Sequence, residues 1–385
     1  MAFFRNDTVN WLNLHYAVHA LALSGSEAFL ASFLLSAGVP APAVLSAVAA
    51  IFATRFLIRA LVLPLARRFG LRAVVIVGTL VSAAQYPVLA VVHGVGPALA
   101  WLCAIAAIGD SLYWTGYHAY FAAVGDAEHR GHQVGAREAA ATLFAIIGPL
   151  ATGLALTTLG PRVAFGITAG VMAVGALPLF RTPDVAIADR APGGYRAAFH
   201  GALIFAADGW TAAGFYYVWQ IALFRSVGQR FAAYGGAMAL AALVGAASGL
   251  VLGKLIDMGH GRRAVVLGMG AIIAAIVLRA VGAGHPVPAV LANAAGAMAI
   301  ALYIPTMSTP VYNLAKAAPC VLRFSMVTEG GFDLGCASGC LTAAGVLWSG
   351  LPIGWAILPA LLGAAAMSDL LTRSYRSPSP FATRS

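Results

Sequence analysis

The sequence predicts an all-α membrane protein with twelve transmembrane helices in two pseudo-symmetric six-helix bundles. Three observations lead to this fold class. First, 61% of the 385 residues are hydrophobic and only 9% are charged, whereas soluble domains carry roughly 25% charged residues. Second, twelve apolar runs are long enough to cross a hydrocarbon core of about 30 Å. Third, the longest polar stretch, 181–198, divides these runs six and six.

The apolar excess excludes an ordinary soluble globule, because a chain of this size could not bury so much apolar surface. The 43 glycines fit membrane helices, which pack closely through small residues. The cysteines have no spacing typical of disulfides or zinc sites, so we interpret them as packing residues. They are Cys103, Cys320, Cys336 and Cys340.

Each expected helix is an apolar run bounded by polar residues, glycine or proline. The expected bounds are 11–36, 42–66, 72–92, 97–124, 136–158, 162–180, 199–224, 232–254, 263–282, 288–315, 326–348 and 352–371. Residues 1–10 are expected to lead into the first helix from the cytoplasm. The chain should therefore form an N-terminal bundle over 1–181, a cytoplasmic linker over 182–198 and a C-terminal bundle over 199–385.

The positions of Lys and Arg predict the orientation, because cytoplasmic loops are enriched in these residues. With the N-terminus inside, 17 of the 23 Lys and Arg residues fall on inner segments, and only Arg162, Arg225 and Arg230 fall on outer loops. We therefore expect both termini in the cytoplasm and the chain in a bacterial inner membrane. This asymmetry explains the formal charge of +10 without a nucleic-acid partner. The expected partners are the lipid bilayer, a small solute and protons, and the expected state is a monomer.

Polar side chains recur in every third expected helix. The runs 11–36, 97–124, 199–224 and 288–315 are rich in them. Because polar groups inside a bilayer face protein or water, these four runs are expected to line one aqueous cavity. The candidate solute-binding residues there are His19, Tyr113, Trp114, Tyr117, His118, Trp210, Asn293 and Tyr303.

Charged residues inside the runs are the main functional signal, because each is costly in a bilayer. Asp110 is the leading candidate to carry a proton, and Glu27 and Asp208 are weaker ones. Arg55 lies at a depth similar to that of Asp110, so the alternative is an ion pair that only holds helices together. An arginine that exchanges between Asp110 and Glu27 is a further interpretation.

The four polar-rich runs contain acids but no Lys or Arg, which favours a neutral or cationic solute. His15 and His19 are four residues apart and could bind a transition metal, but we assign no metal site and no cofactor. The sequence has no phosphate-binding loop and no His-Glu-x-x-His motif, so an ATP-driven pump is not expected. An intramembrane enzyme or a solute sensor has no positive signal.

Three short segments resemble motifs of the major facilitator superfamily, a family of secondary transporters. Its loop signature, Gly-x-Leu-Ala-Asp-Arg-x-Gly-Arg-Lys, is similar to residues 253–263 (GKLIDMGHGRR), which have one inserted residue. The first copy, residues 63–72 (LPLARRFGLR), has Arg67 where the family has Asp. Residues 148–153 (GPLATG) resemble a Gly-Pro motif common in proton-coupled exporters.

The resemblance implies two bundles built from three-helix repeats and a secondary active transporter that works by alternating access. It further implies proton-coupled export of a small organic solute. The alternative is a proton-coupled importer of a small metabolite or a metal complex.

The resemblance also implies gating contacts between these loops and the starts of the fifth and eleventh helices. Because Arg67 replaces the usual acid, we predict a polarity-swapped latch from Arg67 or Arg68 to Glu329, formed when the cytoplasmic side is closed. Asp257 is expected near Arg137 at the start of the fifth helix, next to Glu138, which is a further gating candidate. The remaining gating candidate is Arg262. The alternative is that all these groups are solvated cytoplasmic charges.

Overall fold

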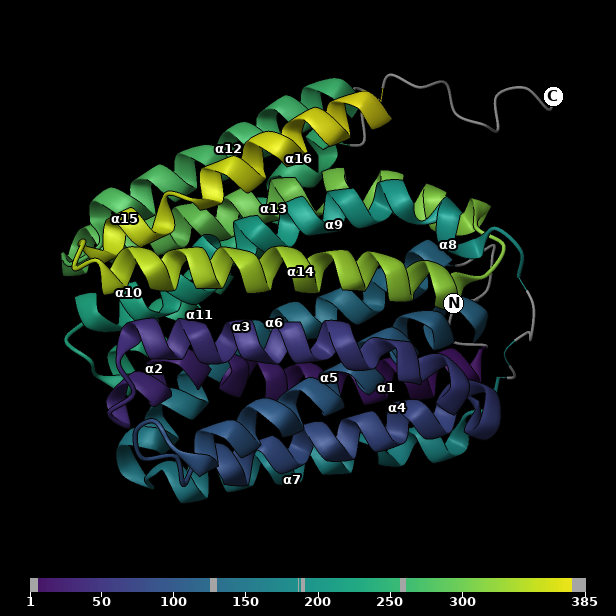
Figure 1. The fold of residues 1–385 in the computed structure, drawn as a ribbon, viewed down its shortest axis with the longest axis horizontal. Helices are drawn as coiled ribbons and strands as arrows, with labels where there is room; N and C mark the ends of the chain where they lie inside the picture. The colour runs from purple at the N-terminus through teal and green to yellow at the C-terminus, as the bar shows by residue number, and fades with distance from the viewer. Residues whose placement is uncertain (1–5, 125–129, 186, 188–190, 257–260, 376–385) are drawn as a thin grey trace.

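The computed structural model describes residues 6–124, 130–185, 187, 191–256 and 261–375. Over these residues the chain is helical and has no β-strand, and ten helical segments are long and apolar enough to cross a membrane. One of them, Ala41–Leu89, contains two of the expected runs. The run that begins at Phe199 is interrupted by a π-helical turn. The predicted class, an all-α membrane fold of two bundles, is confirmed (Figure 1).

The first six expected runs correspond to seven helices and three short 3-10 turns. They are α1 (Asp7–Ser26), the turn Glu27–Phe29, α2 (Leu30–Ser36), α3 (Ala41–Ile58), the turn Arg59–Leu61, α4 (Val62–Leu89), α5 (Pro97–Val124), α6 (Arg130–Thr158), α7 (Pro161–Gly175) and the turn Leu177–Arg181. Gly70, with φ of 82°, breaks α4 where the second run ends and the third begins. Asn6 caps α1, since its side chain accepts from the Val9 amide at 3.1 Å.

The last six runs follow a short helix in the connection, α8 (Gly194–Ala197). They are α9 (Phe199–Ala212), the π-helical turn Ala213–Val218, α10 (Trp219–Ser226), α11 (Phe231–Ile256), α12 (Gly261–Gly282), α13 (Pro286–Ala317), α14 (Val321–Trp348), α15 (Ile353–Ile357) and α16 (Ala360–Ser374). The π turn widens the seventh crossing at its middle, a feature that often marks functional sites.

The two ends of the molecule differ in their connections. At one end, each of six tight turns contains a glycine with positive φ, a conformation that lets a helix stop abruptly: Gly38, Gly94, Gly160, Gly228, Gly284 and Gly350. At the other end α1 begins and α16 ends (Figure 1). There Arg181 lies over the Trp11 ring, 5.7 Å from its centroid. We call this the inner end and the opposite one the outer end, after the predicted orientation.

The halves meet along two helix pairs, α3 with α14 and α6 with α11. Figure 1 shows α3 and α14 side by side at the middle of the molecule. In the second pair, a Cβ added to Gly153 would lie 2.6 Å from the Phe231 carbonyl oxygen and 3.3 Å from Gly235 Cα. The glycine that ends the GPLATG segment therefore allows α6 and α11 to touch.

The outer end is closed by aromatic rings from both halves. Phe29 from the first half packs edge-on against Tyr234 from the second, with ring centroids 5.2 Å apart. The Tyr234 hydroxyl donates to the Ala28 carbonyl at 2.8 Å. Phe29 and Tyr234 are fully buried, so neither solvent nor solute passes between the halves here.

Candidate functional site

A buried ion pair lies between two helices of the first half. Arg55 of α3 is 6% exposed, and its Nη1 donates to Asp110 Oδ2 of α5 at 3.3 Å. The similar depths of Arg55 and Asp110 in their helices predicted this pair. In the bilayer interior such a pair satisfies two charges that would be costly alone.

Helix α14 brings two more acids from the second half to the same place. Asp333 is fully buried; its Oδ1 lies 3.1 Å from Arg55 Nε, and its Oδ2 accepts from Arg59 Nε at 3.1 Å. Glu329 Oε2 lies 3.9 Å from Arg55 Nη2, and Glu329 Oε1 lies 3.2 Å from His118 Nδ1. Arg59 also donates to the Thr115 hydroxyl. The result is one network, which we call the central network, that ties the two halves together near mid-membrane.

The latch predicted for a closed inner end is not formed in this conformation. Glu329 pairs with His118 and Arg55, and not with Arg67 or Arg68, which are both exposed. The physical reason is that α14 begins at Val321, five residues before the expected start. Glu329 therefore lies about 12 Å along the helix from its first residue, deep enough to reach the central network.

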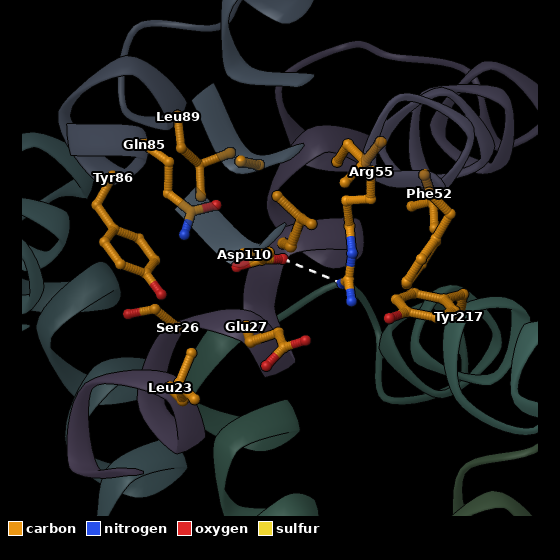
Figure 2. Close-up of a pocket in the computed structure, with 14 residues that line it drawn as sticks. Leu23, Ser26, Glu27, Phe52, Arg55, Gln85, Tyr86, Leu89, Asp110 and Tyr217 are labelled. Atoms are coloured by element: carbon orange, nitrogen blue, oxygen red, sulfur yellow. Dashed lines mark hydrogen bonds and ion pairs between the residues drawn. The ribbon is translucent and has the colours of Figure 1, made fainter. Parts of the chain in front are cut away.

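A small cavity adjoins the central network (Figure 2). It has a volume of about 40 Å³, which is room for about three waters. Glu27, Asp110 and Arg55 face it from three sides, and Tyr217 of the second half closes it beside Phe52. Glu27 is exposed to this space, and no described residue forms an ion pair with it. The cavity thus holds a carboxylate free to take up a proton or a cation.

The candidate residues near the inner half of α5 form an aromatic cluster inside the first half. His19 stacks on Tyr113, with ring centroids 3.7 Å apart, and Tyr113 stacks on Tyr117. His15 Nδ1 lies 2.6 Å from the Gly175 carbonyl oxygen. These four side chains are buried, so they pack α1 against α5 and α7 and do not line the cavity that contains Glu27.

Two neighbouring residues of α5 lie differently. Trp114 is partly exposed and stands edge-on to His19, whereas the side chain of His118 is 41% exposed. Across the described residues, no group of three His, Cys, Asp or Glu side chains is placed to hold a metal ion.

The candidates in the second half make hydrogen bonds within that half. Tyr303 donates to Asp208 Oδ1 at 2.7 Å, and Trp210 Nε1 donates to the Pro359 carbonyl at 2.8 Å. Asn293 accepts from Trp219 Nε1 at 2.9 Å. The structure therefore brings Asp110, Arg55, His118 and Glu329 into one site, whereas Asp208 stays separate with Tyr303.

Three gating candidates, Glu138, Asp257 and Arg262, lie outside the residues whose side chains the structure describes. At the connection between the second and third crossings, the acid missing from the motif is supplied by the linker. Asp184 Oδ1 accepts from the Arg72 backbone amide at 3.1 Å, at the first turn after Gly70. A carboxylate at that position is favoured by the helix dipole.

Sequence reasoning assigned no role to three buried charges, Asp333, Arg59 and Arg279. The pairing of Asp333 with Arg59 depends on which face of α14 meets α3. Arg279 belongs to α12. It is 4% exposed, lies over the Phe215 ring at 3.8 Å and donates to the Phe215 carbonyl in the π turn. Its location within an apolar run was the available signal.

Comparison with known proteins agrees with this architecture. The family profile described as Major Facilitator Superfamily matches residues 12–339. No curated protein sequence matched. A solved auto-inhibited POT family peptide transporter is similar, with 15% identity, a TM-score of 0.75 and coverage of 97% of this chain and 98% of that one.

Two other solved structures are similar. One is a POT family transporter in complex with 5-aminolevulinic acid, with 12% identity, a TM-score of 0.72 and coverage of 96% of both chains. The other is a nucleoside transporter, with 14% identity, a TM-score of 0.65 and coverage of 96% of this chain and 99% of that one. At these identities the likeness concerns the fold.

Proposed function

Because this chain belongs to the Major Facilitator Superfamily and has the fold of a multi-pass secondary transporter, we propose that it exports a small neutral or cationic organic solute in exchange for protons. Transport would proceed by alternating access across a bacterial inner membrane, with both termini in the cytoplasm. The observation that carries the proposal is the central network, in which charges of both halves share partners beside a water-sized cavity.

Alternating access requires contacts between the halves that form and break in turn. Arg55 is bound at once by Asp110 of its own half and by Asp333 of the other. When a proton neutralises Asp110, Arg55 would pair only with the acids of α14. When Asp110 loses the proton, Arg55 would pair with Asp110 again. The network thus offers a physical link between proton binding and the relative position of the halves.

The balance of charge supports a proton and a neutral or cationic solute as the two substrates. The network and its cavity contain four carboxylates, of Glu27, Asp110, Glu329 and Asp333, against the guanidinium groups of Arg55 and Arg59. His118 can supply a further positive charge when protonated. An anionic solute would add to the excess negative charge, whereas a proton or an organic cation would offset it.

The size of the cavity agrees with a closed state between substrate-binding states. A volume of about 40 Å³ admits water but no organic solute. The solute must therefore enter when the halves separate on one side. The outer end is closed by Phe29 and Tyr234, and His118, on the inner side of Asp110 along α5, is 41% exposed. Entry from the inner end is the direction that export requires.

The test uses purified protein in sealed vesicles. A thermal-shift screen of amines and neutral solutes first selects a ligand, since a ligand stabilises the state that it binds. Accumulation against a gradient and one-for-one exchange of that ligand are then measured for wild type and Asp110→Asn. We expect the variant to lose accumulation and to keep exchange, because exchange does not cycle the proton. Asp369→Asn, at an exposed pair with Arg373, is the control. Normal accumulation by Asp110→Asn would contradict the assignment of Asp110.

A further inference from the structure

A second, larger cavity opens at the outer end of the second half. It has a volume of about 510 Å³ and lies where the end of α10, the start of α11 and the start of α13 meet. Its rim carries Arg225 and Arg230, and its floor is apolar, with Leu240 and Val290 among the lining residues. This cavity is separate from the central network, because no residue of the network lines it.

The walls of this cavity are held in place by hydrogen bonds. The Ser226 hydroxyl is buried and accepts from the Gly284 amide at 2.8 Å, which ties the α10–α11 turn to the α12–α13 turn. Gln229 adopts a φ of 56°, and its backbone amide donates to the Phe224 carbonyl at 2.9 Å. This tight turn brings Arg225 and Arg230 to one rim.

The two arginines have no acidic partner among the residues that the structure describes. Both are exposed, and no described acid forms an ion pair with either. The six outer connections contain no Asp or Glu at all in the sequence. Two guanidinium groups lie on one rim at a membrane surface, without an acidic partner among the described residues. They are therefore expected to bind an anion from outside the chain.

The apolar floor specifies what kind of anion. Leu240 of α11, which lines the cavity, is 47% exposed, and two leucines close to lining positions in the sequence, Leu243 of α11 and Leu291 of α13, are 54% and 65% exposed. In a bilayer these side chains face acyl chains, so the cavity with its charged rim adjoins an apolar, lipid-facing surface. A free phosphate would use the rim alone, whereas a phospholipid would use both parts.

We propose that this cavity binds an anionic phospholipid of the outer leaflet. Its phosphate lies between Arg225 and Arg230, and one acyl chain lies along the exposed leucines of α11 and α13. A headgroup of net negative charge is selected over a zwitterionic one, because the ammonium of the latter offsets the attraction of its phosphate to the two arginines.

The test measures lipid binding to the delipidated, purified full chain by native mass spectrometry. Phosphatidylglycerol and phosphatidylcholine with the same acyl chains are titrated onto wild type and Arg225→Gln/Arg230→Gln. We expect wild type to prefer phosphatidylglycerol and the double variant to lose that preference by about tenfold or more. The matched control is Arg162→Gln, which removes the third outer arginine, exposed and away from this cavity. It should keep the preference.

Two further measurements decide between sources of the anion and guard against misfolding. Inorganic phosphate at millimolar concentration is expected not to displace phosphatidylglycerol; full displacement would identify a free-anion site and overturn the lipid assignment. Thermal midpoints of the variants in phosphatidylcholine are expected to equal that of wild type. If the double variant fails to fold, each single variant is expected to lose part of the preference. An unchanged preference in the variants that fold would overturn the proposal.

Discussion

Asp333 is the residue whose replacement tests the central network most severely. It is fully buried and contacts both Arg55 and Arg59 across the boundary between the halves. In Asp333→Asn, Arg59 loses its only acid among the described residues. Removing one partner of a buried ion pair costs about 3–5 kcal/mol. At the lower limit, about 3 kcal/mol, the equilibrium between joined and separated halves would shift by about 100-fold.

The chain contains its own reporters for this shift. Cys336 and Cys340 lie within two turns of Asp333 and are buried against α3, whereas Cys103 Sγ contacts the Ala47 carbonyl inside the first half. Labelling by N-ethylmaleimide, followed by mass spectrometry, is expected to speed up at least tenfold at Cys336 and Cys340 in Asp333→Asn, with Cys103 unchanged.

The matched control is Asp369→Asn. Asp369 pairs with Arg373 four residues on, and the two side chains are 57% and 69% exposed, so the pair is worth under about 1 kcal/mol and labelling should not change. Two results would refute the reasoning. Unchanged rates at Cys336 and Cys340 would mean that the network does not hold the halves together. An equal rise at all three cysteines would mean that Asp333 supports the whole fold.

Two predictions concern packing. Replacing Gly153 by Val places side-chain atoms against the Phe231 carbonyl, and we expect overpacking to lower the free energy of unfolding by about 1–3 kcal/mol. The control is Gly166→Val, where no neighbour lies within 4 Å of an added Cβ. Equal thermal midpoints for the two variants would count against the close contact. Replacing Arg279 by Leu leaves the Phe215 carbonyl without this donor, and we expect thermal unfolding to show a destabilisation of about 1–3 kcal/mol. Arg279→Lys should recover part of this stability. A Leu variant as stable as wild type would show that the π turn does not need Arg279.

The helices were predictable because the bilayer sets their length and the loops are short. The run 97–124 coincides with α5, and most other bounds differ by a few residues. The start of α14 differs more in its consequences: the bounds 326–348 put Arg323 and Ser325 in a loop, but both are buried inside the helix. The expected start placed Glu329 at the inner end, whereas the observed start places it about 12 Å into the helix.

The Arg55–Asp110 pair was predictable from depth alone, because each helical residue advances 1.5 Å and the two runs are close in the chain. The contacts from Asp333 were not, because they depend on the rotation of α14 about its axis, which is set by packing between the halves. The aromatic cluster of His19 and Tyr113 shows the same limit: a polar stripe on a helix can face a neighbouring helix instead of water. The role of Asp184 depends on the course of a loop, for which the sequence has no periodic signal.

The central claim is exchange of a solute for protons. The most direct test is to measure which direction of the proton gradient drives solute accumulation. Vesicles containing the purified protein receive the solute selected by thermal shift, with the lumen made acidic, equal or alkaline relative to the outside. A proton-coupled exporter exchanges outward-moving protons for inward-moving solute, so we expect accumulation above the external concentration only when the lumen is acidic. Accumulation only when the outside is acidic would identify a proton-coupled importer, and equilibration without accumulation in all three conditions would contradict proton coupling.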